Sequence, residues 1–272
     1  MNNTFRSYFP VLFIILGTAI GFTGASLRPD PTKTELNSYQ IAQKQTVLVV
    51  AGDGQGSAVV IKRTNPHGNT RWFAWTAAHV VDGHSEVKIK VILRTEGRKV
   101  GETVYTARVL GASREMDCAL LFIDAAPDAF VPAIFAPNTP ALPGDPIFAC
   151  GNYRGAQFEG SVSTGIIAQI GVQPALSGWP WEICDQTTAP AYPGSSGGPV
   201  FDRHGRVLGL TVGGLNATLN VFVPVRAIAQ WATERGFLWA VRGEWCPAAK
   251  DLRPVVIPKP KPAIASEGGC HQ

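Results

Sequence analysis

Short runs of apolar and β-branched residues, separated by turn-forming residues, begin at Thr46 and continue to Pro224. Runs of this length, bounded by Gly, Pro, Asn and Asp, are typical of β-strands. The first set has six runs, at 46–51, 56–62, 70–80, 86–94, 103–111 and 117–124. A Pro-rich passage follows, and the second set again has six runs, at 146–151, 157–171, 179–187, 198–202, 206–213 and 218–224.

Two sets of six strands predict an all-β protein built from two packed six-stranded antiparallel β-barrels, at about 46–125 and about 146–224. The periodicity by itself fits two β-sandwiches equally well. Residues 225–236 have apolar side chains at helical spacing and end at a glycine, Gly236, which predicts a C-terminal helix. The predicted folded domain is therefore 46–240.

The regions outside this domain have a different composition. The run from Tyr8 to Ala25 is apolar and uncharged. Residues 1–26 are therefore predicted to be either a signal peptide or an N-terminal transmembrane anchor, because the run is close to the shortest helix that spans a bilayer. Either form predicts export to the cell envelope or periplasm, secretion, or attachment to a membrane. Residues 27–45 are predicted to be a linker, and the Pro- and Lys-containing residues 241–272 a flexible tail.

The composition of the chain argues against some classes of function. The net charge of +4 is scattered, without a basic stripe carrying interleaved aromatic residues, so nucleic-acid binding is not expected. Five cysteines lack metal-ligand spacing, which disfavours a zinc site. In an exported protein Cys150–Cys184 and Cys246–Cys270 are candidate disulfides, and Cys118, inside an apolar strand, is expected to be a buried thiol.

The strongest chemical signal is the sequence Pro-Gly-Ser-Ser-Gly-Gly-Pro at 193–199. A serine hydroxyl becomes a nucleophile when a base removes its proton and hydrogen-bond donors stabilise the charge on the attacked carbonyl. We expect Ser196 to be this nucleophile. The N–H groups of Gly194 and Ser196, with that of Ser195 between them, are the predicted oxyanion hole. Gly197 removes side-chain bulk where another strand has to pass behind the serine.

Two further residues complete a predicted catalytic triad. His79 follows an aromatic strand, and Asp117 opens the apolar run of the sixth strand, where a buried carboxylate is costly without a partner. The role of Asp117 would be to orient the imidazole of His79 and to stabilise the imidazolium cation. Asp82 and Asp124 are rival carboxylates. Asp82 is too near His79 in sequence, and Asp124 is at the far end of its strand.

At these motifs the sequence resembles the trypsin-like serine peptidases, and most closely the protease domain of the HtrA (DegP) group. The matching segments are Thr-Ala-Ala-His-Val at 76–80, Asp-Cys-Ala-Leu-Leu at 117–121 and Gly-Ser-Ser-Gly-Gly-Pro-Val at 194–200. The resemblance covers about 46–236. It implies a double barrel with the triad between its halves, and peptide-bond hydrolysis through an acyl-enzyme without a cofactor. The tail is too short for the PDZ domain that usually follows in the HtrA group.

Specificity in this fold depends on the residues just before the serine and on a second wall. The predicted substrate-binding residues are Ala189, Pro190, Ala191, Tyr192, Thr211, Val212 and Gly213. No acidic residue is among them, so a preference for Lys or Arg is not expected. A preference for small or aliphatic side chains before the cut is the hypothesis.

Three other interpretations were considered. Residues 194–198 match the Gly-x-Ser-x-Gly elbow of α/β-hydrolases, but that fold needs a helix after the serine and the chain order Ser, Asp, His. A catalytically silent binding or adaptor protein of the same fold is the second. The third is a virus-type processing protease anchored in a membrane. The expected partners are protein or peptide substrates, with membrane contact through the N-terminal segment, and the sequence carries no signal for an oligomeric state.

Overall fold

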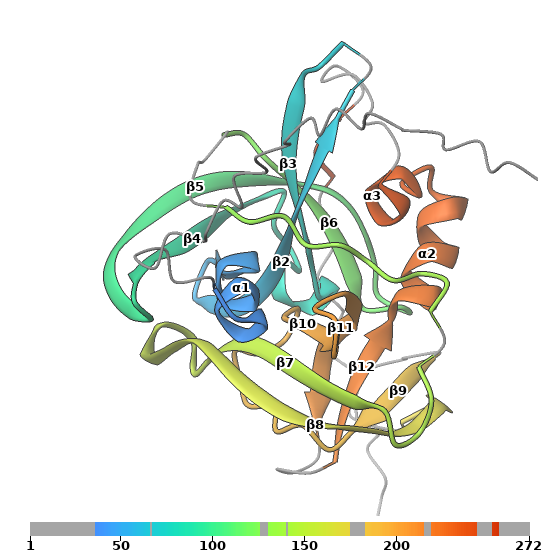
Figure 1. Cartoon of the computed structure of the whole chain (residues 1–272). Coiled ribbons are helices and arrows are strands. Elements are labelled where there is room, and N and C mark those ends of the chain that lie inside the picture. The colour runs from blue at the N-terminus through green and yellow to red at the C-terminus, as the bar shows by residue number, and fades with distance from the viewer. Residues whose placement is uncertain are drawn as a thin grey trace, which may run out of the picture. The chain divides into compact units, whose positions relative to one another are not determined.

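The computed structural model describes residues 36–65, 67–125, 130–139, 141–174, 183–214, 219–243 and 252–255. They contain two closed antiparallel β-barrels of six strands each (Figure 1), which confirms the predicted all-β double barrel. Within these ranges no helix has the length and apolar character needed to cross a bilayer. The segment predicted as a signal peptide or membrane anchor lies outside the described residues.

The first barrel closes in the order β1-β2-β3-β6-β5-β4. Its closure comes from antiparallel pairing of β1 with β4, and Phe73, Trp75 and Leu121 are among its fully buried apolar side chains. Every strand overlaps a predicted run. The strands are β1 Thr46–Ala51, β2 Gly54–Thr64, β3 Thr70–Thr76, β4 Glu86–Thr95, β5 Arg98–Ser113 and β6 Cys118–Ile123.

The second barrel closes in the order β10-β11-β12-β9-β8-β7, and β10 pairs with β7. Phe201, Leu210 and Phe222 are fully buried in it. Of the predicted strand at 179–187, Cys184–Thr187 form β9, and residues 179–182 lie outside the described residues. The strands are β7 Pro146–Tyr153, β8 Phe158–Val172, β9 Cys184–Thr187, β10 Pro199–Asp202, β11 Val207–Gly214 and β12 Asn220–Pro224.

The predicted C-terminal helix is present as α2, Val225–Glu234, followed by the short α3, Trp239–Arg242. The indole ring of Trp231 in α2 lies 6.1 Å from that of Trp75. The helix that follows the second barrel therefore packs against the first (Figure 1).

Both segments expected to be unstructured contain ordered parts. The expected linker ends in a helix, α1 Ser38–Gln45, whose N-terminus is capped because the side chains of Asn37 and Gln40 each accept a hydrogen bond from the other residue's backbone N–H. In the expected tail, Leu252 is buried, and the N–H of Val255 donates to the carbonyl of Val109. Contacts with the barrels order these segments, and the composition of the segments does not predict those contacts.

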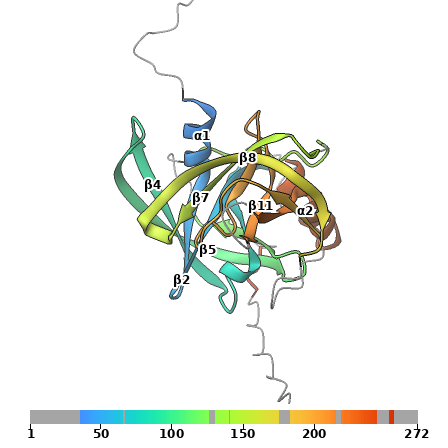
Figure 2. The same ribbon diagram turned by 90° about the horizontal axis from the view of Figure 1, so that it is seen from below.

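The junction between the barrels positions the site. The side-chain amide of Asn152 on β7 donates to the carbonyl of Val47 on β1 over 2.9 Å. Ser57 on β2 donates its N–H to the carbonyl of Ser196 over 2.7 Å. Figure 2, a view turned by 90°, shows α1 and the long, curved β8 beside this junction. The serine segment of the second barrel is therefore fixed against β2 of the first.

Candidate active site

His79 and Asp117 are in direct contact. His79 lies in a single 3₁₀ turn, Ala78–Val80, that follows β3, and Asp117 immediately precedes β6, the strand paired with β3. The Asp117 Oδ2 atom is 2.7 Å from His79 Nδ1, and Asp117 Oδ1 accepts the backbone N–H of His79 over 3.0 Å. Both oxygens of one carboxylate therefore hold one histidine.

The environment of Asp117 is unusual for a carboxylate. Its side chain is 0% exposed, and its φ of +43° is in the left-handed region, which Asp tolerates better than most residues. A buried carboxylate is stable only when hydrogen bonds replace its water. Because an ionised carboxylate only accepts hydrogen bonds, Nδ1 of a neutral His79 carries the proton and Nε2 carries the lone pair. This is the tautomer that a general base requires.

The two rival carboxylates are directed elsewhere. Asp82 forms an ion pair with Arg114, with 3.1 Å between Oδ1 and Nη2. Asp124 has a side chain that is 73% exposed and lies 4.0 Å from Arg108. Among the three aspartates considered, the contacts with His79 are made by Asp117.

The residues before Ser196 form a tight turn. Ser195 donates its N–H to the carbonyl of Tyr192 over 2.9 Å, and Gly194 has a φ of +93°. Proline and glycine at the two central positions, with glycine at positive φ, are the pattern of a type II β-turn. A Cβ atom on Gly194 would collide with the carbonyl of Asn152, so only glycine fits there.

This turn determines which amides face outward. The carbonyl of Pro193 accepts from the N–H of Arg154 over 2.6 Å, and that of Ser195 accepts from Gly198 over 2.8 Å. In a planar trans peptide the N–H points opposite to the carbonyl, so the N–H groups of Gly194 and Ser196 are directed away from these partners. The N–H of Ser195 is used within the turn. The geometry thus offers two amides, whereas the sequence suggested three.

The serine segment and the histidine turn converge on β2. A Cβ atom on Gly197 would strike the carbonyl of Ser57 and the hydroxyl of Thr76, so this glycine permits the close approach expected at that position. A Cβ atom on Gly56 would lie 2.6 Å from a methyl group of Val80 and 3.1 Å from the carbonyl oxygen of Ser196. The neighbour of His79 and the backbone of Ser196 therefore meet over the same residue. After Ser196 the chain enters strand β10, not the helix of an α/β-hydrolase elbow.

A small cavity lies beside the serine turn. Its volume is about 10 Å³ and, of the predicted substrate-binding residues, Ala189, Pro190, Ala191 and Thr211 line it. Tyr192 is 47% exposed, and neither Val212 nor Gly213 lines the cavity. The remaining lining residues are Ala149, Cys150, Tyr153, Thr187, Ser195 and Asn220.

Two of these additional lining residues, Tyr153 and Asn220, hold the segment before the serine through their side chains. The hydroxyl of Tyr153 donates to the carbonyl of Pro190 over 2.9 Å, and the side-chain amide of Asn220 donates to that of Ala189 over 3.0 Å. Both close the cavity through backbone contacts with the segment before the serine. Such contacts depend on which strands become neighbours in the fold, so a local sequence motif does not predict them.

Three cysteines near the site are free thiols: Cys118, Cys150 and Cys184. The suggested Cys150–Cys184 disulfide is therefore wrong, because β8 separates β7 from β9 and two strand spacings exceed the reach of a disulfide. Burial raises the pKa of the Cys150 thiol to about 11, and burial together with the charge of Asp117 raises the pKa of Cys184 to about 12. Both remain neutral at physiological pH. Cys246 and Cys270 lie outside the described residues.

The chain was compared with known protein families and curated sequences. A family model described as "Trypsin-like peptidase domain" matches residues 56–210. Protease Do-like 1, chloroplastic, from Arabidopsis thaliana is 27% identical over 177 residues, which are 60% of this chain and 38% of that protein. Serine protease Do-like HtrB from Bacillus subtilis is 30% identical over 191 residues, 66% of this chain and 39% of that protein. The chain thus matches about two fifths of the length of these relatives.

Solved structures show the same fold. The inactive form of the Rv3671c protease from M. tuberculosis aligns with a TM-score of 0.59 and 23% sequence identity. The alignment covers 76% of this chain and 97% of that structure. At this level of identity the likeness shows the double-barrel fold and does not assign a role to any residue.

Proposed function

Because the chain belongs to the trypsin-like peptidase domain family, we propose that it is a serine endopeptidase with Ser196, His79 and Asp117 as its catalytic triad. The observation that carries the proposal is the two-point contact of the fully buried Asp117 carboxylate with His79. A carboxylate placed in this way holds the imidazole in one orientation and stabilises its cation. The half-buried Ser196, on a turn with two outward-facing amides, supports the role of nucleophile.

Each group has one role in the proposed reaction. The Ser196 hydroxyl attacks the carbonyl carbon of the substrate while His79 Nε2 takes its proton. The negative charge that develops on the carbonyl oxygen is stabilised by the N–H groups of Gly194 and Ser196. The C–N bond then breaks, and the leaving amine takes the proton from His79, which leaves an acyl-enzyme on Ser196. A water molecule, activated by the same imidazole, releases the acid and restores the hydroxyl.

The cavity beside the turn suggests which side chain precedes the cleaved bond. A volume of about 10 Å³ is roughly the space of one water molecule. None of its lining residues is acidic. We propose that it accepts small or aliphatic side chains and rejects Lys and Arg, because a cation buried without a partner is strongly destabilised.

Profiling with a peptide library tests both the activity and this preference. We expect cleavage within the peptides, after Ala or Val, and cleavage after Lys or Arg slower by about 100-fold or more, since each 1.4 kcal/mol of lost binding corresponds to a factor of ten. Replacing Asn220 with Ala removes a side chain that closes the cavity, so this variant should favour Leu over Ala relative to the unmodified protein. Preferred cleavage after basic residues would refute the proposed specificity.

We also propose that the protein is exported. The support is the uncharged apolar run from Tyr8 to Ala25, which lies outside the described residues. Its substrates would then be proteins or peptides of that compartment.

A further inference from the structure

We propose that Ser57 and Asn152 are positioning residues that keep the turn at 193–196 in the conformation whose amides face the substrate. This inference rests on the proposed peptidase function. Neither residue belongs to the predicted triad, oxyanion hole or substrate cavity. Ser57 lies on β2 of the first barrel and Asn152 on β7 of the second, and both are buried to 1% exposure or less.

The Ser57 hydroxyl is fully used. It donates to the carbonyl of Gly194 over 2.8 Å. It accepts from the backbone N–H of Asn152 over 2.8 Å and from the Asn152 side-chain amide over 3.1 Å. A hydroxyl has one donor and two acceptor positions, so no capacity remains. The same residue holds Ser196 through its own N–H.

The bond to Gly194 acts on the peptide between Gly194 and Ser195, the central one of the three peptides within residues 193–196. That peptide joins the carbonyl of Gly194 to the N–H of Ser195, and it is held by Ser57 on one side and by Tyr192 on the other. The two peptides that carry the outward-facing amides flank it directly. If the central peptide rotates, both amides change direction. The Ser57 hydroxyl is therefore placed to control the pair together.

Asn152 connects this hydroxyl to the rest of the turn. Two residues after Asn152, the N–H of Arg154 holds the carbonyl of Pro193. The short segment 152–154 thus contacts both the first and, through Ser57, the central peptide of the turn. A shift of this segment would release the Pro193 carbonyl, which on flipping would point an oxygen where the oxyanion has to bind.

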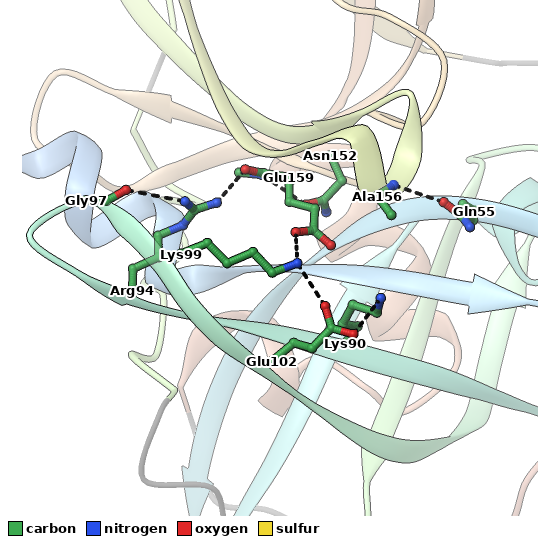
Figure 3. A network of polar contacts seen from close by, with 10 residues as sticks. Gln55, Lys90, Arg94, Gly97, Lys99, Glu102, Asn152, Ala156 and Glu159 are labelled. Carbon is green, nitrogen blue, oxygen red and sulfur yellow. Dashed lines mark hydrogen bonds and ion pairs between the residues drawn. The ribbon is translucent and has the colours of Figure 1, made fainter.

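Asn152 is itself anchored to both barrels. Its side-chain Nδ2 donates to the carbonyl of Val47, and its Oδ1 accepts the N–H of Gly160 over 3.0 Å. The residue before Gly160 is Glu159. Its carboxylate accepts a hydrogen bond from the ammonium group of Lys99 over 2.7 Å, and its carbonyl accepts one from the guanidinium group of Arg94 over 2.5 Å. Figure 3 shows this network reaching from the β4–β5 hairpin to Asn152. The position of Asn152 is therefore set by contacts from both barrels.

The test compares Ser57→Ala with a matched control, Thr46→Val. Thr46 is similarly buried, and its hydroxyl donates to the carbonyl of Ala42 in α1 and not to residues 193–196. We expect Ser57→Ala to lower kcat by about 10- to 100-fold, somewhat less than the loss of an oxyanion-hole donor itself, with KM changed less than about threefold. Thr46→Val should lower the Tm by a similar amount and leave kcat unchanged.

A second measurement separates positioning from folding. A peptide aldehyde binds as a tetrahedral adduct whose oxygen needs the two amides, whereas the peptide alcohol of the same sequence has no carbonyl group and cannot form this adduct. Ser57→Ala should weaken binding of the aldehyde by the same factor as kcat/KM and leave binding of the peptide alcohol unchanged. Asn152→Ala should show the same pattern of affinities, and it replaces Ser57→Ala in the test if the Ser57→Ala protein does not fold.

Two outcomes would overturn the inference. One is a Ser57→Ala protein with wild-type kcat and aldehyde affinity. The other is an equal loss of affinity for the aldehyde and the peptide alcohol, which would indicate general damage to the site. Both leave the proposed function intact if the wild-type protein cleaves peptides. A wild-type protein with no turnover and no labelling by a fluorophosphonate would instead refute the proposed function.

Discussion

Replacing Ser196 with Ala is expected to lower kcat for peptide hydrolysis by about 10⁵- to 10⁶-fold, because the remaining binding and electrostatic groups cannot supply a nucleophile. The fold should persist, since the contacts of residue 196 with Ser57 are made by its backbone. The measurement is kcat on the best library peptide, together with the Tm of each variant.

The neighbouring serine provides the control for this prediction. Ser195 differs from Ser196 by one position, its N–H is used within the turn, and it lines the small cavity. Ser195→Ala should lower kcat by no more than about tenfold, because a residue that only lines a pocket contributes little to the chemical step. If Ser195→Ala abolished turnover while Ser196→Ala retained it, the assigned nucleophile would be the wrong one.

The second large effect is expected for Asp117→Asn, with a loss in kcat of about 10⁴-fold. Asp117 accepts two hydrogen bonds from His79, one at each oxygen. An asparagine has one acceptor and one donor group, so in either orientation one N–H of His79 faces another donor. The imidazole must then adopt the wrong tautomer or leave its place. The measurement is kcat at neutral pH, with the Tm as a check on folding.

Asp82→Asn is the matched variant for this experiment. Asp82 lies close to His79 in sequence but pairs with Arg114 near the surface. Its ion pair is partly exposed, and such pairs contribute little. We expect kcat within about threefold of the wild-type value for Asp82→Asn. A large loss of kcat for Asp82→Asn and a small one for Asp117→Asn would show that the orienting carboxylate belongs to Asp82 and not to Asp117.

The sequence was sufficient to predict the strands because each strand depends on a local pattern of residues, whereas closure into barrels and not sandwiches was implied by the family resemblance. Six apolar runs, a Pro-rich connector and six more runs reproduce the strand sets, and the amphipathic pattern after Pro224 reproduces α2. The contact of His79 with Asp117 was also predictable. A carboxylate that opens a fully apolar strand needs a partner, and the competing Asp82 and Asp124 could be set aside by their positions along the chain.

What the sequence could not predict depends on contacts between distant segments. Helix α1 is an exception, because its Asn–Gln capping box at residues 37 and 40 is a local signal within a polar stretch. The bonds of Ser57 and Asn152 join positions 95 residues apart and follow only from the docking of the barrels. The Cys150–Cys184 pairing failed for the same reason, since spacing along the chain does not reveal that another strand lies between them.

The central claim is that an imidazole from the first barrel activates a hydroxyl from the second. Reaction of the native protein with a fluorophosphonate, followed by peptide mapping by mass spectrometry, tests it most directly. We expect one adduct per chain, on Ser196, formed much more slowly after His79→Ala. An adduct on another residue, or labelling of Ser196 at the same rate without His79, would contradict it.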